Sequence, residues 1–407
     1  MNRPHRPRVL TLADLEVARE EVARIGVREP ALNWLAAKTQ LRAVRLEKVR
    51  GKTAALLKQE CLSVGCDCAV SPAVAAFDDT PRAVIIMATL RQYERLLEQL
   101  KRQVLGLADL AAEVEQALAS YEAARAPVWT CRGRQLPVGQ RTLIMGVLNL
   151  TPDSFSGDGL AGRPQEALAR AQAMIAAGAD ILDIGGESTR PGSDAVPANE
   201  EWARVAPIIE ALAGRDDVVL SLDTRKTEVA EKGLEAGVHI INDVGGLRAP
   251  GMAQVVAASG AGAIIMHMKG EPKTMQVEPT YEDLMTEIYE FLSERMEAAL
   301  EAGVAETAIA VDPGFGFGKT VKHNLTIVRR LRELHTLGRP VVLGPSRKST
   351  IGKVLDKPPE ERVWGTAATC AVGIAAGAHV LRVHDVDEMR QVAQMTDAVL
   401  RGWQPHE

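Results

Sequence analysis

The chain has 407 residues, which is long enough for two domains of ordinary size. A content of 46% hydrophobic and 25% charged residues is typical of a folded globular protein and excludes a disordered chain. The net charge of −5 and the aromatic content of 3% argue against a nucleic-acid or membrane-surface partner, because such partners select basic patches and nucleic acid also selects stacking rings.

The sequence predicts neither a targeting segment nor a membrane span. Basic residues near the N-terminus precede no apolar run, and no stretch of about 18 apolar residues is present. The five cysteines are odd in number and unevenly spaced, which argues against a disulfide framework, so we expect a cytoplasmic protein. Cys61-x4-Cys66-x-Cys68 lacks a second pair or a nearby histidine, so packing residues are favoured over a metal site.

Residues 1–125 predict a small, mostly helical α/β domain whose role the sequence does not indicate. A helix is expected over Thr11–Ile25, with Thr11 as its cap. The apolar run Ala83–Thr89 is typical of a buried strand, and one or two strands are expected in all. Helical periodicity returns in Gln92–Val104 and Leu107–Ala123. Residues 126–140, with two prolines and two glycines, are predicted to be a linker.

From residue 141 to residue 403, short apolar runs alternate with helical stretches. We predict eight strands: Leu143–Asn149, Ile181–Gly185, Val218–Asp223, His239–Asp243, Ala263–His267, Ala308–Asp312, Pro340–Gly344 and His379–His384. Several of the intervening helices end before a glycine suited to a C-cap, namely Gly178, Gly237 or Gly303. Eight β–α units in a region of this length predict a (β/α)8 TIM barrel. An open doubly wound sheet is the alternative.

Polar residues stand at the carboxyl ends of the predicted strands, where the active sites of such barrels lie. In chain order they are Asn149, Glu187–Arg190, Asp223–Lys226, Asn242 and Asp243, His267, Asp312, Ser346–Lys348, and Arg382 with His384. The junctions at the opposite ends are mainly glycine, alanine and proline. A barrel without a site has no reason to concentrate polar residues on one rim, so the sequence predicts an active site there.

Eight motifs in this region resemble, in order, the signature of dihydropteroate synthases. They are Met145–Gly159, Asp183–Gly192, Asp223–Arg225, Asn242–Gly246, Met266–Gly270, Asp312–Lys319, Ser346–Ser349 and Arg382–Asp385. Each alone is weak, but eight in register are specific. The resemblance implies a transferase of folate biosynthesis that joins 6-hydroxymethyl-7,8-dihydropterin pyrophosphate to 4-aminobenzoate and releases pyrophosphate. It also implies a homodimer.

Asp223, Asn242 and Asp312 are the candidates for binding the pterin. A carboxylate can accept both N–H groups of an aminopyrimidinone edge, and an asparagine can donate and accept. The resemblance implies that these residues and Met266 bind the pterin inside the barrel. The alternative is that Asp223 and Asp312 cap the helices that follow them.

Lys348 belongs to the polar loop after the seventh predicted strand. The resemblance implies that it lies over the pterin and reaches both substrates. It also implies that Thr189, Arg190, Phe317 and Ser346 contact 4-aminobenzoate. The alternative for Lys348 is a solvated basic loop.

Arg382 and His384 are two residues apart, so they lie on one face of the eighth strand. Arginine suits bidentate phosphate contact, and the last loops of such barrels often bind phosphate. The resemblance implies that this pair and Asn149 hold the diphosphate, with Asn149 as the protein ligand of Mg²⁺, a cation that keeps several waters. A buried structural histidine and a turn-forming asparagine are the alternatives. We assign catalytic roles to Asp312, Lys348, Arg382 and His384.

Two features depart from the family pattern. The loop after Phe155 and Ser156 reads Gly157-Asp158-Gly159, where the family has Asp-Gly-Gly, so the carboxylate is displaced by one position. Pro345 is also unusual and is expected to stiffen the lysine loop.

The segment DPGFGFGKT resembles a phosphate-binding loop, but Pro313 stands where that pattern needs glycine.

Two other functions fit parts of the pattern. A pterin-dependent methyltransferase shares the floor of aspartate and asparagine but does not need the Ser-Arg-Lys loop, the Thr-Arg-Pro loop or the final arginine and histidine. A non-catalytic pterin-binding paralogue would account for the displaced aspartate and the additional domain. Pterin binding without product formation would distinguish that paralogue from an enzyme.

Overall fold

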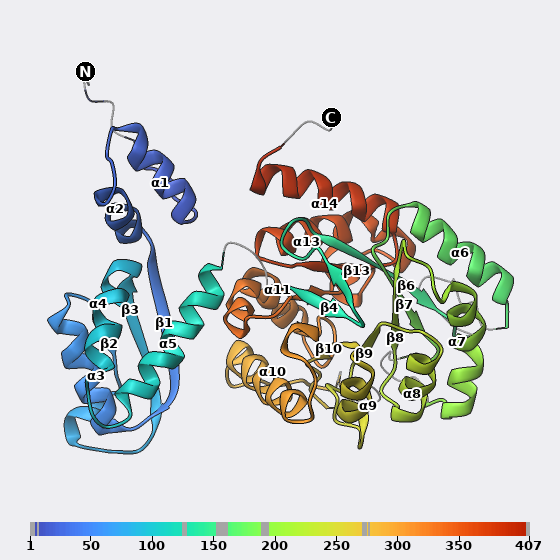
Figure 1. The fold of residues 1–407 in the computed structure, drawn as a ribbon, viewed down its shortest axis with the longest axis horizontal. Helices are drawn as coiled ribbons and strands as arrows, with labels where there is room; N and C mark the ends of the chain where they lie inside the picture. Colours follow the sequence, from blue (N-terminus) through green and yellow to red (C-terminus); the bar gives the residue numbers. More distant parts are fainter. Residues whose placement is uncertain are drawn as a thin grey trace. The chain divides into compact units, whose positions relative to one another are not determined.

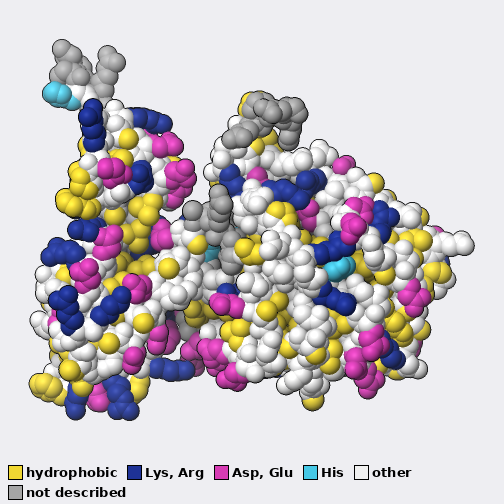
Figure 2. All heavy atoms as spheres, in the orientation of Figure 1, with side chains coloured by type: hydrophobic (Ala, Val, Ile, Leu, Met, Phe, Trp, Pro, Cys, Tyr) yellow, Lys and Arg dark blue, Asp and Glu magenta, His cyan; other side chains and the backbone are white. Residues whose placement is uncertain are grey.

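The computed structural model describes residues 5, 8–123, 128–151, 162–188, 195–270, 275 and 277–403. The chain divides into two compact units, Met1–Ala119 and Ser120–Glu407, coloured blue to teal and teal to red in Figure 1. Among the helices of these described segments, none combines the length and the apolar character needed to cross a bilayer. On the face drawn in Figure 2, acidic and basic side chains are interspersed over both units.

The N-terminal unit contains a three-stranded antiparallel sheet in the order β1-β3-β2. Its elements are α1 (Leu15–Arg24), α2 (Ala31–Thr39), β1 (Leu41–Val49), α3 (Gly51–Ser63), β2 (Asp67–Ala69), η1 (Pro72–Ala76), β3 (Arg82–Thr89), α4 (Leu90–Leu100) and α5 (Leu107–Glu122). Alternate residues of β3, namely Val84, Ile86 and Ala88, are buried in one core with side chains of α3, α4 and α5, because successive strand residues point to opposite faces. The expected α/β domain is confirmed, with more strand than predicted.

Three details of this unit bear on the sequence predictions. The side chain of Asp14, not Thr11, caps α1 by accepting a hydrogen bond from the amide of Val17. Cys61, Cys66 and Cys68 are free thiols buried in the core. The described segments contain no group of three or more His, Cys, Asp or Glu residues able to hold a metal ion.

The second unit is a parallel eight-stranded sheet in the order β11-β10-β9-β8-β7-β6-β13-β12. The strands are β6 (Leu143–Asn149), β7 (Ile181–Gly185), β8 (Val219–Asp223), β9 (Ile240–Asp243), β10 (Gly262–Met266), β11 (Ile309–Asp312), β12 (Val342–Leu343) and β13 (Val380–Val383). A bridge between Val311 and Val341 joins the two ends of the sheet. All eight predicted strands are present, and the predicted (β/α)8 barrel is confirmed.

Helices surround this sheet (Figure 1). They are α6 (Pro164–Ala176), α7 (Ala198–Leu212), α8 (Thr227–Glu235), α9 (Met252–Ser259), α10 (Leu284–Glu301), η2 (Glu306–Ala308), α11 (Val321–Arg329), η3 (Leu331–Leu337), α12 (Ser349–Leu355), η4 (Pro359–Glu361), α13 (Val363–Ala375) and α14 (Val386–Arg401). Their apolar faces and the outer strand residues form one core, which explains why the strands read as nearly continuous apolar runs. Gly178, Gly237 and Gly303 follow α6, α8 and α10 with φ of 93°, 106° and 94°, as expected for C-caps.

Residues 128–140 differ from the predicted linker. Strands β4 (Trp129–Cys131) and β5 (Arg134–Leu136) form a hairpin at the N-terminal end of the barrel. Trp129 is fully buried, and its indole N–H donates to the carbonyl of Ala308 at 3.0 Å. A Cβ on Gly262 would stand 2.4 Å from Sγ of Cys131, so the hairpin packs directly on strand β10. The hairpin therefore closes the end of the barrel opposite the polar rim.

Candidate active site

The strand register aligns several predicted residues at the carboxyl end of the barrel. Asn149 pairs with Gly185, Gly185 with Asp223, and Asp223 with Asn242. Paired residues of parallel strands share one face, so these side chains point to the same layer. A Cβ on Gly185 would lie 3.5 Å from Cβ of Asp223 and 3.7 Å from Oδ1 of Asn149, so the two side chains flank the glycine. Met266 pairs with Asp312 on the next two strands.

Asp223 and Asn242 meet Arg382 and a further carboxylate, Asp183 of β7. Arg382 donates from Nη2 to Asp223 and from Nε to Asp183, both at 2.6 Å. Asn242 donates from Nδ2 to Asp183 at 3.0 Å. Burial raises the pKa of Asp223 to about 7 even though Arg382 opposes that shift. Burial disfavours the charge of Arg382, yet Asp183 and Asp223 raise its pKa above the usual value.

Asp312, Met266, Phe317 and Lys348 form the other side of this rim. Met266 is buried and belongs with Val244, Met268 and Met275 to a small apolar cluster against which Phe317 packs. The Lys348 ammonium lies 4.5 Å from the centroid of the Phe317 ring and donates to the carbonyl of Phe315 at 2.5 Å. Burial lowers the pKa of Lys348 to about 7, although Asp312 favours its charged form. Burial also raises the pKa of Asp312. Lys348 is therefore not on a solvated loop.

The capping alternative for the two aspartates is wrong. The N-cap residue of α8 is Lys226, and that of α11 is Thr320, which forms a capping box with His323. Asp223 instead accepts from Arg382, and Asp312 accepts from the amide of Gly314 at 2.6 Å.

The backbone at Arg347 aims Lys348 inward. Arg347 has a φ of 55°, which is uncommon for a residue with a side chain, and its guanidinium is paired with Asp385 through two donors. Gly316 of the opposing loop has a φ of 86°, which favours glycine, and a Cβ there would stand 3.0 Å from Cδ of Lys348. The ion pair and the close glycine hold the lysine in place.

Ser346 and His384 are bonded to each other. The buried hydroxyl of Ser346 lies 3.0 Å from Nδ1 of His384 and accepts the backbone N–H of that residue at 3.1 Å. When the hydroxyl donates to Nδ1, the proton of a neutral ring is on Nε2, where it can reach an anion. Arg382 lies in β13, two residues before His384, and β12, the strand that precedes Ser346, is the neighbour of β13.

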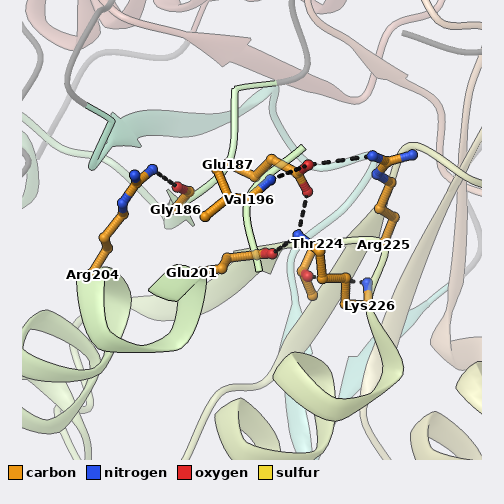
Figure 3. Close-up of polar contacts among 8 residues, drawn as sticks. All are labelled: Gly186, Glu187, Val196, Glu201, Arg204, Thr224, Arg225 and Lys226. Atoms are coloured by element: carbon orange, nitrogen blue, oxygen red, sulfur yellow. Dashed lines mark hydrogen bonds and ion pairs between the residues drawn. The ribbon is translucent and has the colours of Figure 1, made fainter. Parts of the chain in front are cut away.

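A network of ion pairs lies beside strand β7 (Figure 3). Glu187 accepts from Lys226 at 2.6 Å, from Arg225 at 3.3 Å and from the amide of Val196 at 3.3 Å. Lys226 also pairs with the fully buried Glu201. Burial opposes ionisation of Glu187, but the bonds from Lys226 and Arg225 outweigh it and lower its pKa. The network ties the segment after β7 to the start of α8.

The segment that resembled a phosphate-binding loop uses its lysine internally. Lys319 is buried, and its Nζ contacts Nδ1 of His267 and the carbonyl of Phe317, each at 2.9 Å. Burial lowers the pKa of both Lys319 and His267. The structure therefore agrees with the prediction that this segment is not a phosphate-binding loop.

Thr189, Arg190 and Gly157-Asp158-Gly159 lie outside the described residues.

Comparison with known proteins identifies the family. The family described as pterin binding enzyme matches residues 145–384. The dihydropteroate synthase of Synechocystis is 47% identical over 275 residues, which are 65% of this chain and 95% of that protein. The chain belongs to the dihydropteroate synthase family.

Two further members of the dihydropteroate synthase family inform the two units. The crystal structure of the Burkholderia cenocepacia dihydropteroate synthase with 7,8-dihydropteroate has a TM-score of 0.61 and 44% identity, and covers 68% of this chain and 97% of its own. A probable bifunctional folylpolyglutamate synthase/dihydropteroate synthase of Halobacterium salinarum is 40% identical over 388 residues, 95% of this chain and 46% of its own. That span is reached only if the match includes most of the N-terminal unit.

Some residues of this dihydropteroate synthase site were missed by sequence reasoning. Asp183 is fully buried in the barrel interior and bonds to two predicted site residues. The sequence feature that could have revealed Asp183 is a charged residue between Leu182 and Ile184 in a predicted buried strand, where an unpaired carboxylate would be costly. The pairing of Lys319 with His267 had no such local signal.

Proposed function

We propose that the chain condenses 6-hydroxymethyl-7,8-dihydropterin pyrophosphate with 4-aminobenzoate, giving 7,8-dihydropteroate and pyrophosphate in folate biosynthesis. The observation that carries this proposal is one rim where buried Asp223, Asn242 and Asp312 lie beside two cations, Lys348 and Arg382. The acidic and amide groups suit an aminopyrimidinone, and the cations suit a diphosphate and the charge that develops on it.

Pterin recognition uses the floor of the barrel. The carboxylate of Asp223 or Asp312 accepts two N–H groups of the pterin, and the Oδ1 atom of Asn242 accepts another, since its Nδ2 is already bonded to Asp183. Met266 and Phe317 supply apolar contact from the neighbouring cluster. Lys348 lies over the ring from the side of Phe317.

The diphosphate is held at the end of β13. Arg382 and His384 stabilise the departing charge. Asn149 fits as the protein ligand of Mg²⁺, because its amide oxygen faces the same layer as the carboxylate of Asp223, and this cation takes few protein oxygens when phosphates supply the rest. When bound, Mg²⁺ neutralises charge on the diphosphate.

The reaction is a dissociative substitution at the pterin methylene. The C–O bond breaks and its electron pair leaves with the diphosphate. The resulting cation is delocalised into the pterin, and Asp312 stabilises it electrostatically. The amine nitrogen of 4-aminobenzoate then attacks the methylene and loses a proton, with no covalent intermediate on the enzyme. Phe317 and Ser346, with Thr189 and Arg190 from the loop after β7, contact this second substrate.

An isotope experiment tests that mechanism. The oxygen that joins the pterin methylene to the diphosphate is labelled with ¹⁸O, and unreacted substrate is recovered before the reaction is complete. Scrambling of the label without arylamine supports the dissociative step. A label that never scrambles, together with C–O cleavage that requires arylamine, contradicts it.

Pyrophosphate release tests the function itself. The purified chain is mixed with the pterin pyrophosphate, Mg²⁺ and 4-aminobenzoate, with Asp312→Ala as the control. Release that depends on the arylamine and disappears in the control supports the synthase. Pterin binding without release would instead favour the non-catalytic paralogue or a different arylamine.

We also propose that the chain acts as a homodimer in the cytoplasm. Helices α12, α13 and α14 carry exposed apolar side chains, among them Val354, Trp364, Val372 and Val399, which is the character of a buried interface. Trp364→Glu is expected to shift the molar mass measured by light scattering from two chains to one. Five free, buried cysteines suit a reducing compartment.

A further inference from the structure

Asp183 is a carboxylate with no exposed surface in the middle of strand β7. It accepts from Ser221 Oγ at 2.7 Å, from Asn242 Nδ2 at 3.0 Å and from Arg382 Nε at 2.6 Å. The three donors come from β8, β9 and β13. A single buried side chain thus joins four strands of the barrel directly beneath the rim.

We propose that Asp183 is a positioning residue that turns Asn242 and Arg382 toward the pterin pyrophosphate, an inference that rests on the proposed function. Asp183 has no exposed surface, so it acts through the two residues that it holds. Burial of a carboxylate costs free energy unless it is fully hydrogen-bonded, and three donors meet that need here.

The contact with Asn242 decides which way its amide faces. An asparagine amide carries one acceptor and one donor group, and rotation by half a turn exchanges them. Because Asp183 can only accept, it takes the Nδ2 donor and leaves Oδ1 for the substrate. The pterin edge offers N–H donors at that level, so the orientation that Asp183 imposes is the one that binds.

The contact with Arg382 fixes the plane of its guanidinium. Nε is taken by Asp183 and Nη2 by Asp223, and a planar group held at two points cannot rotate. Among the hydrogen bonds formed by the described residues, Nη1 of Arg382 is not used. That donor is therefore available for a diphosphate oxygen at a set angle. The side chain is already ordered before the substrate binds, so binding does not include the entropy cost of ordering it.

Asp183→Asn tests the proposal by calorimetry and steady-state kinetics. Asn242 and Arg382 both donate to Oδ2 of Asp183, and Ser221 donates to Oδ1, so an asparagine can accept from both only through a neutral amide oxygen, with its N–H groups toward Ser221. The charge-assisted part of both hydrogen bonds is then lost. We expect 6-hydroxymethyl-7,8-dihydropterin to bind about 10- to 100-fold more weakly, by analogy with the loss seen when the hydrogen-bond partners of metal-binding residues are removed. For the pyrophosphate ester we expect kcat to fall as well. Unchanged affinity and kcat in a folded variant would overturn the proposal.

Asp180→Asn is the matched control. Asp180 lies just before the same strand and accepts from Arg141 and from the amide of Ile144, and within the described part of the chain it contacts none of the predicted site residues. We expect a lower melting temperature with unchanged pterin affinity. If both variants lose affinity equally, Asp183 acts through general stability and the proposal fails.

A second pair of variants removes dependence on one substitution. In Asp183→Ala both Asn242 and Arg382 lose the oxygen to which they donate, so we expect pterin to bind at least as weakly as in Asp183→Asn. If Asp183→Asn does not fold, Ser221→Ala removes one donor from Asp183 without touching Arg382 and is expected to weaken pterin binding about two- to tenfold. Affinity equal to the wild type in Ser221→Ala, in that case, would overturn the proposal.

Failure of the proposed function can be distinguished from failure of the proposal for Asp183. Pterin binding is measured without arylamine, so it reports on Asp183 whether or not the chain forms product. A wild-type chain that binds pterin but releases no pyrophosphate contradicts the function and leaves the test of Asp183 intact.

Discussion

Replacement of Arg382 by methionine removes the counter-charge shared by Asp183 and Asp223. Both carboxylates are buried, with exposures of 0% and 8%, and each accepts a 2.6 Å bond from this guanidinium. Loss of one partner from a buried ion pair typically costs about 3–5 kcal/mol, because an uncompensated charge is left in the interior. In a barrel of this size about 1 kcal/mol corresponds to roughly 2–4 °C, so we expect the melting temperature to fall by about 6–20 °C at pH 8.

The loss of stability in Arg382→Met should depend on pH. The folded-state pKa of Asp223 is about 7, above the unfolded value of about 4, so its contribution to stability is full below the unfolded pKa and is lost as pH rises through 7. Without Arg382 this pKa should rise further, since Arg382 opposes the shift. Protonation at about pH 5.5 then relieves part of the cost, whereas the full cost is felt at pH 8.

Thermal unfolding of the wild type, Arg382→Met and Arg382→Lys at both pH values measures this effect. Arg382→Lys keeps the charge but cannot bridge both carboxylates in one plane, so it should fall between the other two. A deficit of Arg382→Met that is the same at both pH values, or below about 1 kcal/mol, would refute the account of the carboxylates as dependent on Arg382.

Three further predictions concern separate parts of the barrel. With Lys348 at a pKa of about 7, kcat/KM should fall as pH rises through 7, and Lys348→Arg should move that limb to higher pH; superimposable pH–rate profiles would contradict this. Glu187→Gln should raise KM for the arylamine severalfold and leave pterin affinity unchanged by calorimetry, because Glu187 ties the segment after β7 to Lys226; the reverse pattern would count against it. Trp129→Ala should cost about 3–5 kcal/mol by urea unfolding, because a fully buried ring and its bond to Ala308 are lost, with KM unchanged at the opposite rim; Trp129→Phe should recover much of that loss.

Local pattern carried most of the architecture. Parallel strands covered on both faces read as continuous apolar runs, and glycines with positive φ end the helices, so eight strands and their order followed from neighbours in the chain. Because carboxyl ends of parallel strands share one rim, Asp223, Asn242, Asp312 and Arg382 could be assigned to one site before any distance was known. The strands of the N-terminal unit were predicted less completely. Strand β1 carries four charged residues, so it lacks the apolar run that marks a buried strand.

What only the tertiary structure decided are the contacts across the closed barrel. The register of β7 against β6, and of β6 against β13, brings Asp183 to Arg382 across 199 positions of sequence, and no local pattern encodes that distance. The same holds for Ser346 with His384, for Lys319 with His267, and for the hairpin of Trp129, which composition had marked as a linker. Sequence alone determined which polar groups reach the rim, because strand direction is a local property. Closure of the barrel determined which of them hold one another, because that depends on packing between distant strands.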